Sequence, residues 1–122
     1  MIDRTEHKQS VIEALTEAQK IAFSPLSFNA IAALINLGIL KLIDEKSECS
    51  FVIKEKLNLS EYTVNTLLEV AEALGLVISE EEVFTITELG KMFLYDDMTI
   101  ANFNFVKDVC YKGAEKLTDS FI

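Results

Sequence analysis

The segment from Pro25 to Ile43 constrains the fold more than any other part of the chain. It reads as a single helix that Pro25 opens in its first turn, after Ser24, and it carries apolar residues on nearly every side. A helix that is apolar all round must be covered on all sides. A chain of 122 residues is about one domain, and one small domain can rarely cover such a helix alone. The sequence therefore predicts that a second copy of the chain covers it.

Gly38 lies inside this segment. A glycine in a helix interior costs about 1 kcal/mol relative to alanine. Gly38 therefore either permits a close approach of two backbones or marks a bend.

The longer stretch from Ile21 to Ile43, which includes this segment, is also long enough to cross a bilayer, which takes about 20 residues. It contains polar residues such as Ser24 and Asn29, however, and acidic residues follow it without a basic cluster. The N-terminal stretch MIDRTEHKQS has no apolar core and is not a secretory signal. The two cysteines, Cys49 and Cys110, fit reduced thiols better than a disulfide framework. We expect a buried helix, no membrane partner and a cytoplasmic protein.

A shorter apolar stripe precedes this segment. Between residues 5 and 22, apolar residues recur at spacings of three and four, which predicts an amphipathic helix with a narrow stripe. We expect this helix and the next one to be exchanged between the two protomers of a homodimer. The predicted dimer interface comprises Val11, Ile12, Leu15, Phe28, Ile31, Leu34, Ile35 and Leu42.

Two helices and a hairpin follow. Residues 51–58 read as a short helix capped by Ser50, with Asn58 in the left-handed position at its end. A longer helix begins after Ser60 and stops at Gly75, and strands are expected over residues 76–79 and 83–87. The pattern predicts a mainly α fold with a small β-hairpin: a winged helix-turn-helix core with additional N-terminal dimerisation helices and a C-terminal helix.

The helix after the hairpin begins at a Thr87 cap. Leu89, Met92 and Phe93 are expected to face inward from it. We divide the chain into an N-terminal dimerisation helix (residues 1–22), a winged-helix domain (23–94) and a C-terminal helical segment (95–122).

Acidic residues occupy the surfaces that would contact DNA in a winged helix. The face of residues 61–74 opposite the core stripe carries Glu61, Asn65, Glu69 and Glu72, and the turn of the hairpin carries three consecutive glutamates, residues 80–82. The net charge is −9, so phosphates are repelled at long range. A solvated turn that keeps edge strands soluble explains the glutamates equally well. Either way, we expect no nucleic-acid partner.

The sequence offers no self-sufficient active site. The four glycines are too scattered to cradle a phosphate. His7 is the only histidine and has no nucleophile nearby in sequence, and the Asp96–Asp97 pair fits a helix N-terminus. We expect no catalytic, cofactor-binding or metal-binding residues.

The stretch NFNFVKDVCYKG, residues 102–113, is apolar on two sides at helical spacing, and Gly113 is a candidate interruption of the helix. One interpretation is further core or dimer packing. The other is the lining of a pocket for an apolar or aromatic small molecule. The candidate lining residues are Phe103, Val106, Cys110 and Tyr111.

The order of three motifs resembles the N-terminal dimerisation domain of S-adenosylmethionine-dependent O-methyltransferases. The motifs are SPLSFNAIAALINLGILKLI, VIKEKLNLSEYTVNTLLEVAEALGLV and VFTITELGKMFL, between about Phe23 and Leu94. The family pattern has a long helix ending in an LGI turn, a helix-turn-helix ending in LGL and a hairpin closing in Thr-x-x-Gly. Gly38-Ile39, Leu74-Gly75-Leu76 and Thr87 to Gly90 occupy these places.

The resemblance implies a domain that intertwines with its twin, while a following Rossmann-like domain binds S-adenosylmethionine and methylates a small aromatic or apolar acceptor. It also implies that residues 102–122 lead into the catalytic domain and help to roof the acceptor pocket. The sequence ends before any glycine-rich loop, so we expect no catalysis from these 122 residues alone and a truncated chain or fragment. The alternatives are a stand-alone winged-helix transcriptional regulator with a small-molecule effector, or a small intact enzyme with an unrecognised site.

Overall fold

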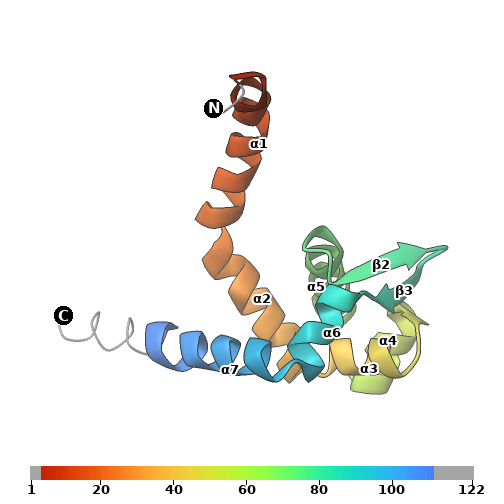
Figure 1. Cartoon of the computed structure of the whole chain (residues 1–122). Coiled ribbons are helices and arrows are strands. Elements are labelled where there is room, and N and C mark those ends of the chain that lie inside the picture. The colour runs from red at the N-terminus through yellow and green to blue at the C-terminus, as the bar shows by residue number, and fades with distance from the viewer. Residues whose placement is uncertain (1–3, 112–122) are drawn as a thin grey trace, which may run out of the picture.

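The computed structural model describes residues 4–111 and has the expected winged helix-turn-helix architecture (Figure 1). Strands β1 (Glu48–Cys49), β2 (Val77–Glu80) and β3 (Val83–Ile86) form an antiparallel sheet in the order β1-β3-β2. Helix α7 continues into a π-helical turn, Lys107–Tyr111. The helices are α1 (Arg4–Ala22), α2 (Ser24–Asn36), α3 (Ile39–Glu45), α4 (Ser50–Leu57), α5 (Glu61–Ala73), α6 (Glu88–Tyr95) and α7 (Asp97–Val106). The predicted fold class is confirmed.

The hydrophobic core lies where the end of α2, α3, α4, α5 and the hairpin meet. Helix α2 packs on α5, and α3 packs on α4, α6 and β3. Helices α1 and α7 extend away from this body in different directions (Figure 1). The buried core residues are Leu34, Ile39, Leu40, Ile43, Ile53, Val64, Leu68, Ala71, Leu76, Val77 and Ile86.

The chain covers part of the apolar segment itself. Leu34 at the end of α2 and Ile39 and Leu40 of α3 are fully buried, and Ile43 is 2% exposed, because helices α4, α5 and α6 pack around them. Other large apolar residues of the segment are only half-buried, so they keep surface that the predicted second copy can cover: Phe28, Ile31, Ile35 and Leu42.

The apolar segment is two helices and not one. Gly38 has a φ of 83°, in the left-handed region, and it separates α2 from α3. The N–H of Gly38 donates to the carbonyl of Ile35 at 3.1 Å and closes the end of α2. The bend alternative for Gly38 is confirmed, because glycine adopts positive φ without the steric penalty of a Cβ.

The helix-turn-helix follows the expected cap chemistry except at its start. Asn58 takes the left-handed position after α4 with a φ of 53°, and the Ser60 hydroxyl accepts from the N–H of Thr63 at 3.1 Å. Ser50 was expected to cap α4, which is wrong: Ser50 is the first helical residue, and Cys49 precedes it without a side-chain cap. Cys49 is instead held by the short strand β1, which pairs with β3 and whose two residues were too few to show a sequence pattern.

A two-residue turn forms the tip of the wing. Glu80 pairs with Val83 across the hairpin, and the turn residues Glu81 and Glu82 both have positive φ, at 49° and 67°. Two consecutive positive φ values are typical of the tight hairpin turn that matches the twist of the strands. This turn keeps the wing short and places the carboxylates of Glu81 and Glu82 at the tip of the hairpin, between β2 and β3.

The Thr-x-x-Gly motif fastens α6 to the end of α5. The Thr87 hydroxyl donates to the carbonyl of Gly75 at 2.6 Å and accepts from the N–H of Gly90 at 3.1 Å. Phe93 is half-buried on α6. Leu89 and Met92 were expected to face inward, but they are 48% and 42% exposed, because the core face of this short helix is occupied by buried Gly90.

Candidate dimerisation surface and adjoining cavities

An arm formed by α1 and the first turn of α2 leaves its apolar side chains in solvent. Every residue from 11 to 26 is exposed. The spacing of Val11 and Leu15 places them on one face, while Glu17 and Lys20 form an ion pair at 3.4 Å on another. The large apolar residues of the arm are 55–77% exposed: Val11, Ile12, Leu15, Ile21, Phe23 and Leu26. The arm is thus an amphipathic helix whose apolar side chains the chain itself does not cover.

No single helix in the described part of the chain is long and apolar enough to cross a membrane. Helices α1 and α2 reach the required length and composition only together, and they are bent by 58° where they meet.

The eight residues of the predicted dimer interface lie in three environments. Val11, Ile12 and Leu15 are on the exposed arm. Phe28, Ile31, Ile35 and Leu42 are half-buried. Leu34 is a core residue with no exposed surface and is therefore unavailable to a partner.

An aromatic cluster joins α2, α6 and α7. The ring of Phe28 stacks on that of Phe103, with centroids 4.2 Å apart and planes 18° apart. Phe93 meets the same Phe103 ring edge-on at 5.7 Å. The structure therefore brings together one residue predicted for the dimer interface and one predicted for a ligand pocket. Such pairs stabilise packing by about 0.5–1.5 kcal/mol beyond the burial of area, so the cluster fixes the angle at which α7 leaves the body.

A cavity of about 250 Å³ lies beside this cluster. Its apolar lining consists of half-buried side chains from α2, α6 and α7: Ile35, Phe93, Leu94, Ile100 and Phe103. Its polar lining consists of Asn36 and Asn104, both exposed, and Lys107, which is half-buried. The exposed amides mark the polar side of the cavity as its mouth.

Of the three predicted pocket residues whose side chains the structure describes, one lines this cavity. Phe103 does, whereas half-buried Val106 and exposed Cys110 do not, and the Tyr111 side chain lies outside the described part. Asn104 and Lys107 were missed, although Lys107 lies four positions after Phe103 and therefore shares its side of the helix, and Asn104 lies three positions before Lys107. Asn36 carries no such local signal, because it reaches the site from another helix.

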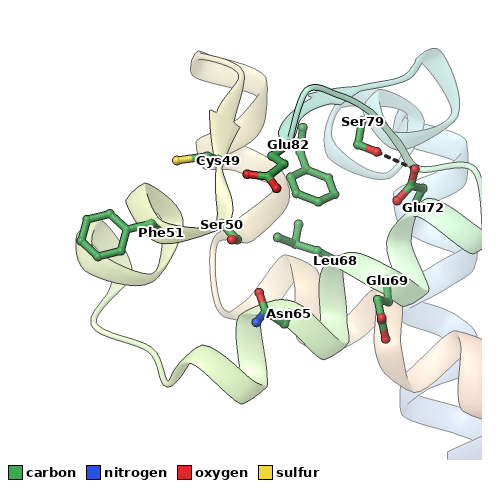
Figure 2. Close-up of a pocket in the computed structure, with 10 residues that line it drawn as sticks. Cys49, Ser50, Phe51, Asn65, Leu68, Glu69, Glu72, Ser79 and Glu82 are labelled. Carbon is green, nitrogen blue, oxygen red and sulfur yellow. Dashed lines mark hydrogen bonds between the residues drawn. The ribbon is translucent and has the colours of Figure 1, made fainter.

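A second and larger cleft, of about 540 Å³, separates α4 and α5 from the wing (Figure 2). Asn65, Glu69 and Glu72 line it from α5, and Glu82 lines it from the turn of the wing. The Ser79 hydroxyl donates to the Glu72 carboxylate at 2.7 Å. Two of the three carboxylates predicted on the helix-turn-helix face, Glu69 and Glu72, thus share a single concave surface with one glutamate of the wing.

Two ionisable side chains near the start of α7 have shifted pKa values. Tyr95 donates to the carboxylate of Asp44 on α3, and this hydrogen bond raises the pKa of Tyr95. Asp96 caps α7 by accepting from the hydroxyl and the N–H of Thr99, at 2.6 and 2.8 Å, and these bonds lower the pKa of Asp96. Both serve to hold helices, and no group of three potential metal ligands occurs among the residues that the structure describes.

Comparison with solved structures shows where this architecture recurs. The S-adenosylmethionine-dependent methyltransferase SibL, in its apo form, is 19% identical over 88% of this chain, with a TM-score of 0.69. The mitomycin 7-O-methyltransferase MmcR is 19% identical over 96%, with a TM-score of 0.67. PigF with SAH is 16% identical over 67%, with a TM-score of 0.58. At these identities the likeness shows the fold, and the chain spans only 33%, 35% and 24% of the three structures.

No curated protein sequence matches the chain. A family model does, over residues 15–84, and its description is Dimerisation2-like domain. The matched range takes in the exposed end of α1, the aromatic residue Phe28, the helix-turn-helix and most of the wing. Since it covers more than half of the chain, this protein belongs to the Dimerisation2-like domain family.

Proposed function

We propose that this chain is the dimerisation domain of an S-adenosylmethionine-dependent O-methyltransferase, and that two copies pair through the α1–α2 arm. The observation that carries the proposal is the unbroken run of exposed residues from 11 to 26 with its six large apolar side chains. Each such side chain gains about 1.5–3 kcal/mol when it passes from water into an apolar interface. Leaving these side chains in water is therefore unfavourable, and pairing with a second copy of the chain would bury them.

The half-buried apolar residues of α2 extend the proposed interface from the arm toward the body. Phe28, Ile31, Ile35 and Leu42 each retain surface that a partner can cover. The interface therefore comprises seven of the eight predicted residues, with Leu34 left out.

The catalytic part of the proposed enzyme lies outside these 122 residues. A following domain would bind S-adenosylmethionine and carry out the methyl transfer, and α7 would lead toward it and help to roof the pocket of a small aromatic or apolar acceptor. The fold shared with two methyltransferase structures, and with PigF bound to SAH, supports this assignment. The two free thiols, Cys49 and Cys110, fit the reducing cytoplasm.

Sedimentation velocity tests the pairing. We expect a dimer at micromolar concentration for the native chain and a monomer for Leu15→Glu, because the variant loses an apolar contact and buries a carboxylate at the interface. These two costs together exceed about 3 kcal/mol, or more than 100-fold in the dissociation constant. Lys20→Glu is the control: it places a carboxylate on the face of α1 that carries Glu17, away from Val11 and Leu15, and should remain dimeric. A monomeric native chain, or equal behaviour of the two variants, would overturn the proposal.

A further inference from the structure

We infer that the cavity between α2, α6 and α7 binds a single aromatic ring that carries an anionic group, such as a carboxylate or a phenolate. Lys107 and the amides of Asn36 and Asn104 would hold the anionic group at the mouth. The inference that this cavity binds such a ligand does not depend on the proposed function. The cavity's interpretation as part of the methyl acceptor's binding site rests on the proposed function.

The size and walls of the cavity select a flat apolar ligand. An apolar cavity of about 150 Å³ is known to hold benzene, and this one measures about 250 Å³. Phe93 and Phe103 meet edge-on, so their two rings line the cavity with different orientations. Aromatic rings prefer stacked and edge-on neighbours at such distances. A ring with one or two substituents therefore fits both the volume and the walls.

The charge at the mouth selects an anion. Lys107 is half-buried and forms no salt bridge with any residue that the structure describes, whereas Lys54 and Lys91, the other half-buried lysines of the described part, each form one. Lys41 and Lys46 also form none, but both are exposed to water. The whole sequence has 20 acidic against 11 basic residues, and yet none of the described acidic residues pairs with this half-buried lysine. A ligand carboxylate would replace the missing counter-ion, and hydrogen bonds to charged groups are among the stronger ones.

The backbone is also irregular at this point. Regular α-helix ends at Val106, and the π-helical turn begins at Lys107 itself. π-Helical turns are rare and occur frequently at functional sites. Lys107, the cation in the described lining of the cavity, is the first residue of such a turn.

The test is a titration of the full chain, followed by amide NMR spectra, with benzoate and with its neutral analogue benzamide. We expect benzoate to shift resonances of Phe93, Ile100 and Phe103, and to bind about tenfold or more tightly than benzamide. Lys107→Met should weaken benzoate binding about tenfold or more and change benzamide binding less than twofold. Lys91→Met, which removes a half-buried lysine paired with Glu88 at 3.7 Å, is the control and should bind like the native chain.

Three results would overturn the inference: no shift of these resonances by about 20 mM benzoate, equal affinity for benzoate and benzamide, or benzoate binding that survives Lys107→Met. If that variant does not fold, the comparison of the two ligands on the native chain still decides. Sedimentation of the same samples separates the two proposals. If the chain is a dimer but does not bind benzoate, only the ligand site is refuted. If the chain is a monomer that binds benzoate, only the proposed pairing is refuted.

Discussion

Replacing Gly90 with alanine should destabilise the fold, although alanine favours helices. Gly90 lies in the first turn of α6, and its φ is not positive, so its conformation does not require glycine. Helix propensity alone would make Gly90→Ala stabilising by up to about 1 kcal/mol. Sequence reasoning without the fold therefore gives the wrong sign.

The tertiary contacts reverse this sign. A Cβ on Gly90 would collide with the backbone carbonyl oxygen of Leu76 and would lie 2.7 Å from Cγ1 of Ile86. Overpacking of this kind costs about 1–3 kcal/mol. Moving α6 away would also strain the hydrogen bond from Thr87 to Gly75, which is worth about another 1 kcal/mol. The sum, about 2–4 kcal/mol, exceeds the propensity gain, so we expect a net loss of about 1–3 kcal/mol.

Urea unfolding followed by circular dichroism measures this loss, at one fixed protein concentration because pairing would raise the apparent stability. Lys91→Ala, at the next residue of the same helix, removes only an exposed ion pair and should stay within about 0.5 kcal/mol of the native chain. An unchanged or raised midpoint for Gly90→Ala would refute the reasoning. It would mean that the Leu76 carbonyl and the Ile86 side chain can move away from the added Cβ without lowering the free energy of unfolding.

Two further predictions concern acid and DNA. The bonds from Thr99 place the pKa of Asp96 in the folded state below its unfolded value, so its contribution to the N-terminus of α7 is complete above the unfolded pKa and is lost as the pH falls through the folded pKa. The protection factors of the α7 amides, which are corrected for the slower intrinsic exchange at low pH, should therefore fall in acid, and Asp96→Asn should reduce that dependence. An unaltered profile in the variant would contradict this role. Because Glu69, Glu72 and Glu82 line one cleft, we expect no salt-dependent binding to duplex DNA in fluorescence anisotropy. Binding that weakens steeply with salt would favour the alternative of a winged-helix regulator.

Local chemistry made much of the fold predictable. Four residues cap or end a helix as their side chains and backbone preferences dictate: Ser60, Thr87, Asn58 and Gly75. The order of helix-turn-helix and hairpin followed from periodicity of 3.6 and 2. These features depend on residues within one or two turns of each other, which is why sequence alone could identify them.

The candidate sites were predictable only in part, since they depend on residues that are distant in sequence. Phe103 was identified from helical spacing, but its stacking partner Phe28 and the cavity residue Asn36 come from α2, far earlier in the chain. Leu34 and Leu15 look equally apolar in sequence, yet one is fully buried and the other is 61% exposed. Nothing local distinguishes them, because burial is set by what packs against each helix.

The sequence by itself determined the winged-helix class, the helix ends, the amphipathic first helix and the acidic face of α5. Only the tertiary structure decided that the apolar segment breaks at Gly38, that the chain buries the half after the break, and that the uncovered apolar surface lies mainly on the arm. The physical reason is that hydrogen-bond capping and side-chain periodicity act over a few residues, whereas burial depends on which distant elements meet in space.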